Sequence, residues 1–275
     1  MAIRLLAFDL DGTTITEHQY LSNRNRDALI RAAEQGILLV PATGRMRGFI
    51  PEEIKSLPGV RYAVTSNGAE VCDLQSGETV YRNLIPNEKA REVQRLLDGY
   101  DIFIEYYRDG RAITRAGFPE LAKTHFQFPK PKWHFLIKDY LLVDDFGRMI
   151  EETGICPEKI NLPYLTEGLH REVWDKLESL GGLKLTSSIP DNIEINNGSA
   201  NKGDGLQALC RILEVAPEEV MAVGDNGNDV AMLEYAGCSV AVADGSPSVL
   251  EAAKYKTGPH DEDGLAEAVE RLLLS

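Results

Sequence analysis

The chain has 275 residues, of which 43% are hydrophobic and 26% are charged, a composition typical of a globular protein with one large or two moderate domains. Its formal net charge of −14 argues against electrostatic binding to nucleic acid or to an anionic membrane, because both need a basic protein surface. A small anionic substrate is compatible with this charge if a few basic side chains and a metal ion create a locally positive pocket.

The cysteines indicate a reducing compartment. Cys72, Cys156, Cys210 and Cys238 form no Cys-x-x-Cys pair and have no histidine nearby at zinc-site spacing. Such scattered cysteines are typical of cytoplasmic proteins. The start of the chain has no signal-peptide pattern, and no run of about 20 apolar residues suggests a membrane span. We therefore expect a cytoplasmic protein, either a monomer or a homodimer, that binds neither nucleic acid nor membrane.

The first apolar run, residues 5–8, ends in two carboxylates, Asp9 and Asp11, followed by Gly12. The run predicts a buried strand that leads into a polar turn, and if strand geometry continued as far as Asp11, both carboxylates would lie on one face. Carboxylates this close raise each other's pKa unless a proton or a cation separates them. Mg²⁺ takes such oxygen ligands together with phosphate oxygens. The alternative is that Asp9 to Gly12 form a turn with no catalytic or metal-binding role, since Asp and Gly both favour turns.

The next segments continue this pattern. Residues 23–35 carry apolar side chains at helical spacing and are followed by Gly36, so a helix is expected there. Residues 37–40 then predict a second buried strand, which leads into Thr43-Gly44-Arg45. A strand, a helix and a strand, with polar residues at each strand exit, are typical of a parallel α/β sheet.

A third predicted strand, residues 62–65, ends at Ser66-Asn67-Gly68-Ala69. Asn-Gly is a common turn sequence, so the first interpretation is a hairpin that joins Val64 to Val71. The second interpretation is that Asn67 contacts a substrate, because it too follows a strand.

The pattern changes between Arg82 and Ile189. Aromatic residues are concentrated here, and no predicted strand ends in an acid-rich turn. The expected helices are at 88–97 and 169–180, and the expected strands at 102–107, 111–114, 159–164 and 183–187. We interpret residues 83–189 as an inserted α+β domain of ordinary size. It would divide a single sheet domain into residues 1–82 and 190–275.

The parallel-sheet pattern is expected to resume at Ile193, and Lys202 then opens a helix that runs through Leu213. Residues 220–223 predict a further buried strand, which leads into Gly224-Asp225-Asn226-Gly227-Asn228-Asp229. The remaining expected elements are a strand at 239–242 and helices at 230–236, 246–253 and 264–274.

Because parallel strands point the same way, the polar turns at their carboxyl ends should meet at one edge of the sheet, where α/β folds bind ligands. The residues expected in this cleft are Asp9, Asp11, Thr43, Arg45, Lys202, Asp225, Asn228 and Asp229. Each group has a simpler interpretation when taken alone: an exposed lysine, a surface loop, or a turn with a helix N-cap. Their coincidence at successive strand exits favours a catalytic site.

This set of residues suits phosphoryl transfer, which depends mainly on positioning and charge neutralisation. Asp9 is the candidate nucleophile, since a carboxylate can attack phosphorus. A cation held by Asp9, the backbone carbonyl of Asp11 and Asp225 would neutralise charge, while Lys202 and the Thr43 hydroxyl would hold the phosphoryl oxygens. Asp11 is then available as general acid for the leaving alcohol and as general base for water.

Four segments, Asp9-Leu10-Asp11-Gly12-Thr13, Thr43-Gly44-Arg45, Lys202-Gly203 and Gly224-Asp225-Asn226-Gly227-Asn228-Asp229, together resemble the four motifs of the haloacid dehalogenase (HAD) superfamily. Ser66-Asn67-Gly68-Ala69, and an insert between the second and third motifs, resemble the Cof-like phosphatases with a type IIB cap. The resemblance covers the two parts of the sheet domain and carries few motifs in the insert.

The resemblance implies a Rossmannoid three-layer core with a mainly parallel sheet and an inserted α+β cap that selects the substrate. It implies Mg²⁺-dependent hydrolysis of a small phosphorylated metabolite, such as a sugar phosphate, through an aspartyl-phosphate at Asp9, with Asp11 as the second catalytic residue. The implied phosphate-binding and substrate-binding residues are Thr43, Gly44, Arg45, Asn67, Lys202 and Asn228. The implied metal ligands are Asp9, Asp11, Asp225 and Asp229. The division of roles between Asn228 and Asp229 stays open.

Two segments depart from the family pattern. Val242-Ala243-Asp244-Gly245 stands where relatives commonly carry Met-Gly-Asn, and residues 258–264 stand where they commonly carry an Asn before an acidic turn. In the insert, Phe126, Phe128, Trp133 and Phe135 are expected to form its own core rather than a platform on which a base stacks. The candidate substrate contacts there are Tyr106, Arg115, Lys132 and His134.

Two other functions stay open at this point. A phosphomutase of the phosphomannomutase type shares this kind of cap, and phosphate release without an acceptor sugar would count against it. A non-catalytic binding protein would be expected to have lost part of the acidic set, which is intact here.

Overall fold

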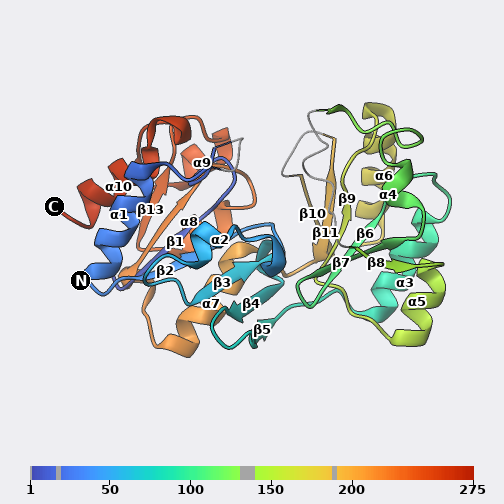
Figure 1. Cartoon of the computed structure of the whole chain (residues 1–275), viewed down its shortest axis with the longest axis horizontal. Helices are drawn as coiled ribbons and strands as arrows, with labels where there is room; N and C mark the ends of the chain where they lie inside the picture. Colours follow the sequence, from blue (N-terminus) through green and yellow to red (C-terminus); the bar gives the residue numbers. More distant parts are fainter. Residues whose placement is uncertain (1, 17–19, 131–139, 188–190) are drawn as a thin grey trace. The chain divides into compact units, whose positions relative to one another are not determined.

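The computed structural model describes residues 2–16, 20–130, 140–187 and 191–275 (Figure 1). They form two compact units, one of Met1–Arg82 and Asn201–Ser275, and one of Asn83–Ala200. We call them the core unit and the inserted unit. None of the helices in the described residues has both the length and the apolar character that crossing a membrane requires.

The core unit is built on a five-stranded sheet with the order β14-β13-β12-β1-β2, in which every pairing is parallel. Strand β1 lies between β12 and β2 and is buried on both faces, as expected for a strand in which every residue is apolar. Leu6 and Phe8 pack into one hydrophobic cluster, and Leu5 and Ala7 into another. The strands are β1 (Leu5–Phe8), β2 (Leu38–Pro41), β12 (Val220–Gly224), β13 (Cys238–Ala241) and β14 (Tyr255–Lys256).

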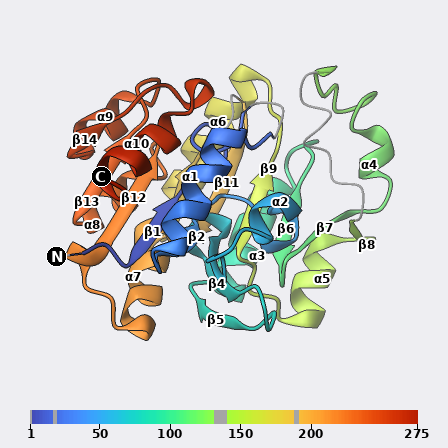
Figure 2. The same cartoon turned by 60° about the vertical axis from the view of Figure 1, so that its left-hand side comes forward.

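Helices cover both faces of this sheet, which gives three layers (Figures 1 and 2). On one face, α1 (Asn23–Glu34) and α10 (Gly264–Leu272) contribute Leu29 and Val269 to the first cluster. On the other face, Leu206 and Met232 pack into the second cluster. The helices there are α7 (Lys202–Leu213), α8 (Val230–Tyr235) and α9 (Pro247–Ala252). The predicted fold class, a parallel-sheet core with an additional α+β unit, is confirmed.

A small antiparallel sheet of three strands adjoins β2. It contains β3 (Tyr62–Thr65), β4 (Glu70–Asp73) and β5 (Thr79–Arg82), and single parallel bridges connect Leu39 with Val60 and Ala42 with Val64. Val64 pairs with Val71, so the predicted hairpin between them is confirmed. Short helical segments, α2 (Glu52–Lys55) among them, connect β2 to β3.

The inserted unit has a six-stranded sheet with the order β10-β11-β9-β6-β7-β8, antiparallel except for the parallel pair of β7 and β8. The strands are β6 (Glu105–Arg108), β7 (Arg111–Arg115), β8 (Leu141–Val143), β9 (Lys159–Leu162), β10 (Leu183–Thr186) and β11 (Ile193–Asn197). The helices are α3 (Asn87–Leu97), α4 (Phe118–Leu121), α5 (Phe146–Thr153) and α6 (Glu167–Ser179).

The two faces of this sheet differ in chemistry. Tyr106, Ile160 and Ile195 point to one face and pack into a hydrophobic cluster with α3, α5 and α6. Their neighbours along each strand point to the other face, which is polar although it is buried: Lys159 Nζ donates to Glu194 Oε1 at 2.7 Å. This alternation follows from the period of two residues in a β-strand.

The prediction that the parallel sheet resumes at Ile193 is wrong. Strand β11 pairs antiparallel with β9 and β10, and the inserted unit continues to Ala200, eleven residues beyond its expected end at 189. The physical reason lies in the Ile-Glu-Ile sequence. It alternates apolar and charged residues, as a strand with two different faces does, whereas parallel core strands are apolar throughout.

Candidate active site

The carboxyl ends of β1, β2 and β12 lie side by side, because Phe8 pairs in register with Pro41 on one side and Val223 on the other. Asp9, Thr43 and Asp225 follow these three strands directly or after one further residue. The order of the strands therefore gathers these polar side chains at one edge of the core sheet, where such folds bind ligands.

Lys202 lies at the centre of the site. The Asn201 side chain caps α7 by accepting a hydrogen bond from the backbone N–H of Asp204 at 2.9 Å, which makes Lys202 the first residue of the helix. The lysine is 0% exposed, and its Nζ donates to Asp9 Oδ1 and to Asp229 Oδ1, each at 2.6 Å. It is thus a buried cation between two carboxylates and not an exposed residue at a helix start.

Burial and charge act against each other at this centre. Burial raises the pKa of Asp9 well above its usual range, Lys202 opposes the rise, and Asp229 and Asp225 add to it. Burial alone would lower the pKa of Lys202, but Asp229 and Asp9 hold it above its ordinary value. Burial and Asp229 raise the pKa of Asp225. The site therefore has more negative charge than its one lysine neutralises.

Three carboxylates can share a cation here. Asp9, Asp225 and Asp229 each offer an oxygen atom, and these atoms all lie within 4.8 Å of one another. Three carboxylates and one ammonium leave a net charge of −2, and a hard divalent cation with oxygen ligands fits that charge. A side chain at Gly12, where φ is +81°, would come within 2.8 Å of Asp225 Oδ2, so this glycine leaves the carboxylate room.

Other contacts orient the carboxylates. Thr13 Oγ1 donates to Asp225 Oδ1 at 2.7 Å. Asp229 uses its second oxygen, Oδ2, to accept the backbone N–H groups of Asp225 and Asn226 at 3.0 Å each. Asp229 therefore holds both the lysine and the loop after β12, a double role that the sequence analysis missed. The sequence analysis also missed the hydrogen bond from Thr13 to Asp225. The position of Thr13 within the first motif could have indicated that its hydroxyl lies near the carboxylates.

Asp11 is arranged differently from the other carboxylates. Strand β1 ends at Phe8, so strand alternation does not extend to Asp11, and its carboxylate does not join the cluster around Lys202. Instead, Arg45 binds it through two hydrogen bonds, from Nε to Oδ2 at 2.8 Å and from Nη2 to Oδ1 at 2.5 Å. The condition under which Asp9 and Asp11 would share one face, strand geometry as far as Asp11, is therefore not met.

The remaining predicted residues surround Thr43, which is fully buried. Thr43 Oγ1 accepts the backbone N–H of Arg45 at 3.1 Å, and its carbonyl accepts the backbone N–H of Asn67 at 3.1 Å. Gly44 lies between Thr43 and Arg45 in the same loop. Asn228 Nδ2 donates to Asn67 Oδ1 at 3.2 Å, while the buried Asn228 Oδ1 has no hydrogen-bond partner in the described part of the chain. Such a buried polar atom is what a bound ligand can satisfy.

Residues 6–269 match the family model described as haloacid dehalogenase-like hydrolase. The chain belongs to this family. 5-Amino-6-(5-phospho-D-ribitylamino)uracil phosphatase YcsE of Bacillus subtilis is 30% identical, over 99% of this chain and 96% of its own. Pyridoxal phosphate phosphatase YbhA of Escherichia coli is 26% identical over 98% of each chain.

Solved structures agree with this assignment. A haloacid dehalogenase-like hydrolase from Bacteroides thetaiotaomicron has a TM-score of 0.80 and 31% identity, with 98% of this chain and 99% of that chain covered. The HAD subclass IIB sugar phosphatase BT4131 has a TM-score of 0.81 and 25% identity, with 98% of each chain covered. The resemblance stated from the motifs is confirmed, and this HAD-like hydrolase is a phosphatase.

The two segments that depart from the family pattern contact each other in this HAD-like hydrolase. The backbone N–H of His260 donates to Asp244 Oδ1 at 3.0 Å, and His260 Nδ1 contacts Asp244 Oδ2. Burial would raise the pKa of Asp244, but hydrogen bonds from His260 hold it below its usual range. Two residues further on, the backbone N–H of Ser246 donates to the Asp225 carbonyl at 2.7 Å. The departures therefore form one hydrogen-bonded pair beside the loop that carries Asp225.

The structure does not place the predicted substrate contacts of the inserted unit together. Tyr106 is buried in the hydrophobic cluster, and its hydroxyl donates to Gln94 Oε1 at 2.7 Å, so the prediction for this residue is wrong. Arg115 is exposed at the end of β7, with its guanidinium 5.9 Å from the ring centre of Phe118. Lys132 and His134 lie outside the described residues, as do Trp133 and Phe135. Phe126 and Phe128 pack against Phe103, which confirms that they belong to the unit's own core.

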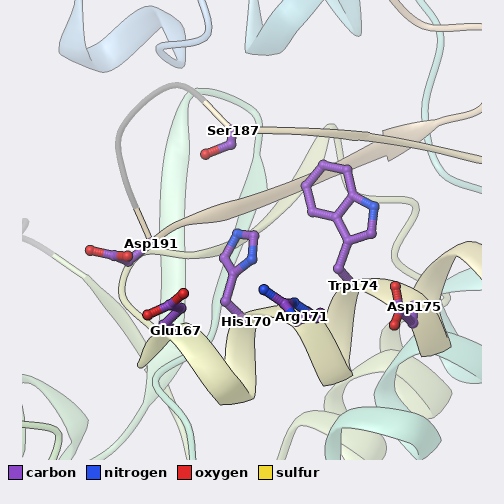
Figure 3. A pocket seen from close by; sticks show the side chains of 7 residues that line it. All are labelled: Glu167, His170, Arg171, Trp174, Asp175, Ser187 and Asp191. Carbon is purple, nitrogen blue, oxygen red and sulfur yellow. The ribbon is translucent and has the colours of Figure 1, made fainter.

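The inserted unit also has a cavity of about 340 Å³ beside α6 (Figure 3). The rings of His170 and Trp174 are stacked with their centres 5.7 Å apart, and His170 Nε2 lies 3.0 Å from the Asn192 carbonyl oxygen. Sequence reasoning missed this cavity, because polar residues on a helix are typical of a solvent-exposed face. The lining residues are Glu167, His170, Arg171, Trp174, Asp175, Ser187 and Asp191.

Proposed function

We propose that this chain is a Mg²⁺-dependent phosphatase that hydrolyses a small phosphorylated metabolite, a sugar phosphate or a similar monoester, through an aspartyl-phosphate on Asp9. The observation that carries the proposal is the position of Lys202, buried at the edge of the sheet and bonded to both Asp9 and Asp229. Removing the charges of a lysine and several carboxylates from water costs folding free energy. A phosphate-binding role explains why the chain keeps these charges buried at one place.

Asp9 is suited to be the nucleophile. The hydroxyl of Thr14 donates to the backbone carbonyl of Asp9 at 2.5 Å, and Lys202 holds Oδ1, so both the main chain and the side chain are fixed. Lys202 also favours the ionised carboxylate, which is the form that attacks. In the first step a carboxylate oxygen bonds to phosphorus while the bond between phosphorus and the leaving oxygen breaks.

Asp11 would supply the proton for that step. Its carboxyl group gives a proton to the leaving alcohol, and in the second step it takes a proton from the water that attacks the aspartyl-phosphate. The products are inorganic phosphate and the free Asp9 carboxylate, so the residues return to their starting state. In this proposal Lys202, the Thr43 hydroxyl and the Asn228 amide would donate hydrogen bonds to the phosphoryl oxygens.

The residues that would hold Mg²⁺ are Asp9, Asp225 and the backbone carbonyl of Asp11, with Asp229 as a further carboxylate of the same cluster. When bound, the ion would neutralise the charge that develops on the phosphoryl group. The excess negative charge of the cluster and the elevated pKa values of Asp9 and Asp225 support this assignment, because a divalent cation would relieve both.

We assign the catalytic role to the core unit and substrate selection to the inserted unit, which would act as a cap. The relatives support a small phosphate ester as substrate: YcsE and YbhA are named for a phosphorylated ribitylaminouracil and for pyridoxal phosphate, and BT4131 for sugar phosphates. We place the reaction in the cytoplasm, with the protein as a monomer or a homodimer.

The test is phosphate release from a panel of phosphorylated metabolites, with and without Mg²⁺ and after chelation. D9N should lower turnover by about 10³-fold or more, while its circular dichroism spectrum stays that of the folded wild type. D27N, on the exposed side of α1, is the matched control and should have wild-type activity. Mass spectrometry of acid-quenched enzyme should find the phosphoryl group on the peptide that contains Asp9. An active D9N variant would refute the proposal, and phosphate release only with an acceptor sugar would indicate a mutase.

A further inference from the structure

The pair of Arg45 and Asp11 carries an inference that rests on the proposed function and deepens it. The geometry points to Arg45 as a positioning residue that holds the carboxylate of Asp11 in place for acid and base catalysis. Arg45 acts on the reaction through Asp11 and not through a contact with the phosphoryl group.

The first observation is the fork geometry. The guanidinium donates to both carboxylate oxygens of Asp11, from Nε at 2.8 Å and from Nη2 at 2.5 Å. Two parallel hydrogen bonds between planar groups fix the plane and the position of the carboxylate, whereas a lysine could offer only a point charge. In the described part of the chain, Arg45 is the one hydrogen-bond partner of this carboxylate.

The second observation shows which partner is anchored. The Arg45 side chain is 15% exposed and that of Asp11 is 52% exposed. Nη1 of Arg45 also donates to the Phe49 carbonyl at 3.1 Å. The main chain of Arg45 is bound as well: its N–H donates to Thr43 Oγ1 at 3.1 Å and its carbonyl accepts the Ser66 N–H at 2.8 Å. Arg45 is therefore the fixed partner, and Asp11 takes its position from it.

The third observation is charge. Asp9, Asp225 and Asp229 form a cluster that leaves the Asp11 carboxylate out, although Asp11 is only two residues from Asp9. A carboxylate that is half exposed and unbound would occupy several rotamers and would be drawn to any cation in that cluster. The ion pair with Arg45 keeps Asp11 apart, which preserves one carboxylate for proton transfer. An acid and base group needs this fixed placement to reach the leaving oxygen.

The test is a double-mutant cycle of R45A and D11A, with an alkyl phosphate and p-nitrophenyl phosphate as substrates. With the alkyl phosphate, R45A should lower kcat by about 10- to 100-fold and change KM by less than about three-fold, because general acid catalysis contributes about 10²- to 10⁴-fold. In the D11A background, removal of Arg45 should cost almost nothing, since residues that act through one another are not additive.

The leaving group supplies a second readout. Nitrophenolate needs no proton to depart, so the pre-steady-state burst from p-nitrophenyl phosphate should survive in R45A while later turnovers are slow. R45K keeps the charge but not the fork and should resemble R45A; it also serves if R45A does not fold. R47A is the matched control, because Arg47 lies in the same loop and donates to the Gly77 carbonyl at 2.8 Å. It should leave kcat unchanged.

Two results would overturn the inference: a rise in KM with unchanged kcat in R45A, or effects of R45A and D11A that simply multiply. Either one would make Arg45 an independent substrate contact. These failures are distinct from failure of the proposed function, because an active D9N would refute the nucleophile whatever the cycle shows.

Discussion

Replacement of Lys202 by methionine removes the positive charge at the centre of the site while keeping a side chain of similar length. The lysine is 0% exposed and makes two ion pairs of 2.6 Å, so the variant leaves Asp9 and Asp229 buried without their cation. Breaking a buried ion pair from one side costs about 3 to 5 kcal/mol, a large part of the about 5 to 15 kcal/mol that stabilises most domains.

The assay is urea unfolding in the presence of a chelator, so that no divalent metal can take the place of the lysine. With a urea m value of about 3 kcal/mol/M, K202M should unfold at a urea concentration lower by about 1 M or more. K176M is the matched control. It breaks an exposed ion pair of 2.8 Å with Glu172 and should leave the midpoint unchanged.

A double variant separates lost packing from lost charge compensation. In K202M/D229N one of the two uncompensated carboxylates is gone, and the asparagine oxygen can still accept the backbone N–H groups of Asp225 and Asn226. The double variant should therefore be more stable than K202M. If K202M is no less stable than K176M, or if D229N destabilises it further, the account of this centre as a charge-balanced cluster is refuted.

Two further sites, Gly68 and Asp73, test the core unit away from the carboxylate cluster around Lys202. G68A should destabilise by about 3 kcal/mol or more in urea unfolding, because φ is +89° and the new Cβ would lie 1.9 Å from the Asn201 carbonyl oxygen. G77A, with φ of +74° and open space around the new Cβ, should cost about 1 kcal/mol in the same assay. Burial raises the pKa of Asp73, but Arg61 and two backbone N–H groups lower it overall, so its ionised form stabilises the fold above the unfolded pKa of about 3.9. D73N should therefore have a lower urea midpoint than the wild type at neutral pH, and this deficit should disappear as the pH falls through the lowered folded-state pKa; an equal deficit at both ends would contradict the ion pair.

Local sequence signals were sufficient for the strands that carry the site. The ends of β1 and β12 lie within one residue of the predicted ends. An apolar stretch followed by a polar turn can be recognised as a buried strand without knowing which strands it pairs with. A residue that follows a buried parallel strand must lie at the edge of the sheet. The meeting of Asp9 and Asp225 could therefore be predicted from the sequence.

Where partners decide the structure, prediction failed. Strand β11 was assigned to the wrong sheet, since its apolar residues show that it is a strand but not which strands it pairs with. Tyr106 was predicted to contact a substrate, yet β6 places it toward the helices and places Glu105 and Tyr107 on the other face. Both faces of that strand offer a tyrosine, so alternation alone could not distinguish them.

The sequence by itself determined that apolar strands alternate with helices in the core unit and which residues stand at the strand exits, because both depend on neighbours along the chain. Only the tertiary structure decided that Arg45 binds Asp11, 34 residues away, and that Asp229 binds Lys202, 27 residues away. A hydrogen bond needs its atoms within about 3 Å, and the path of a loop to that accuracy depends on everything that packs against it.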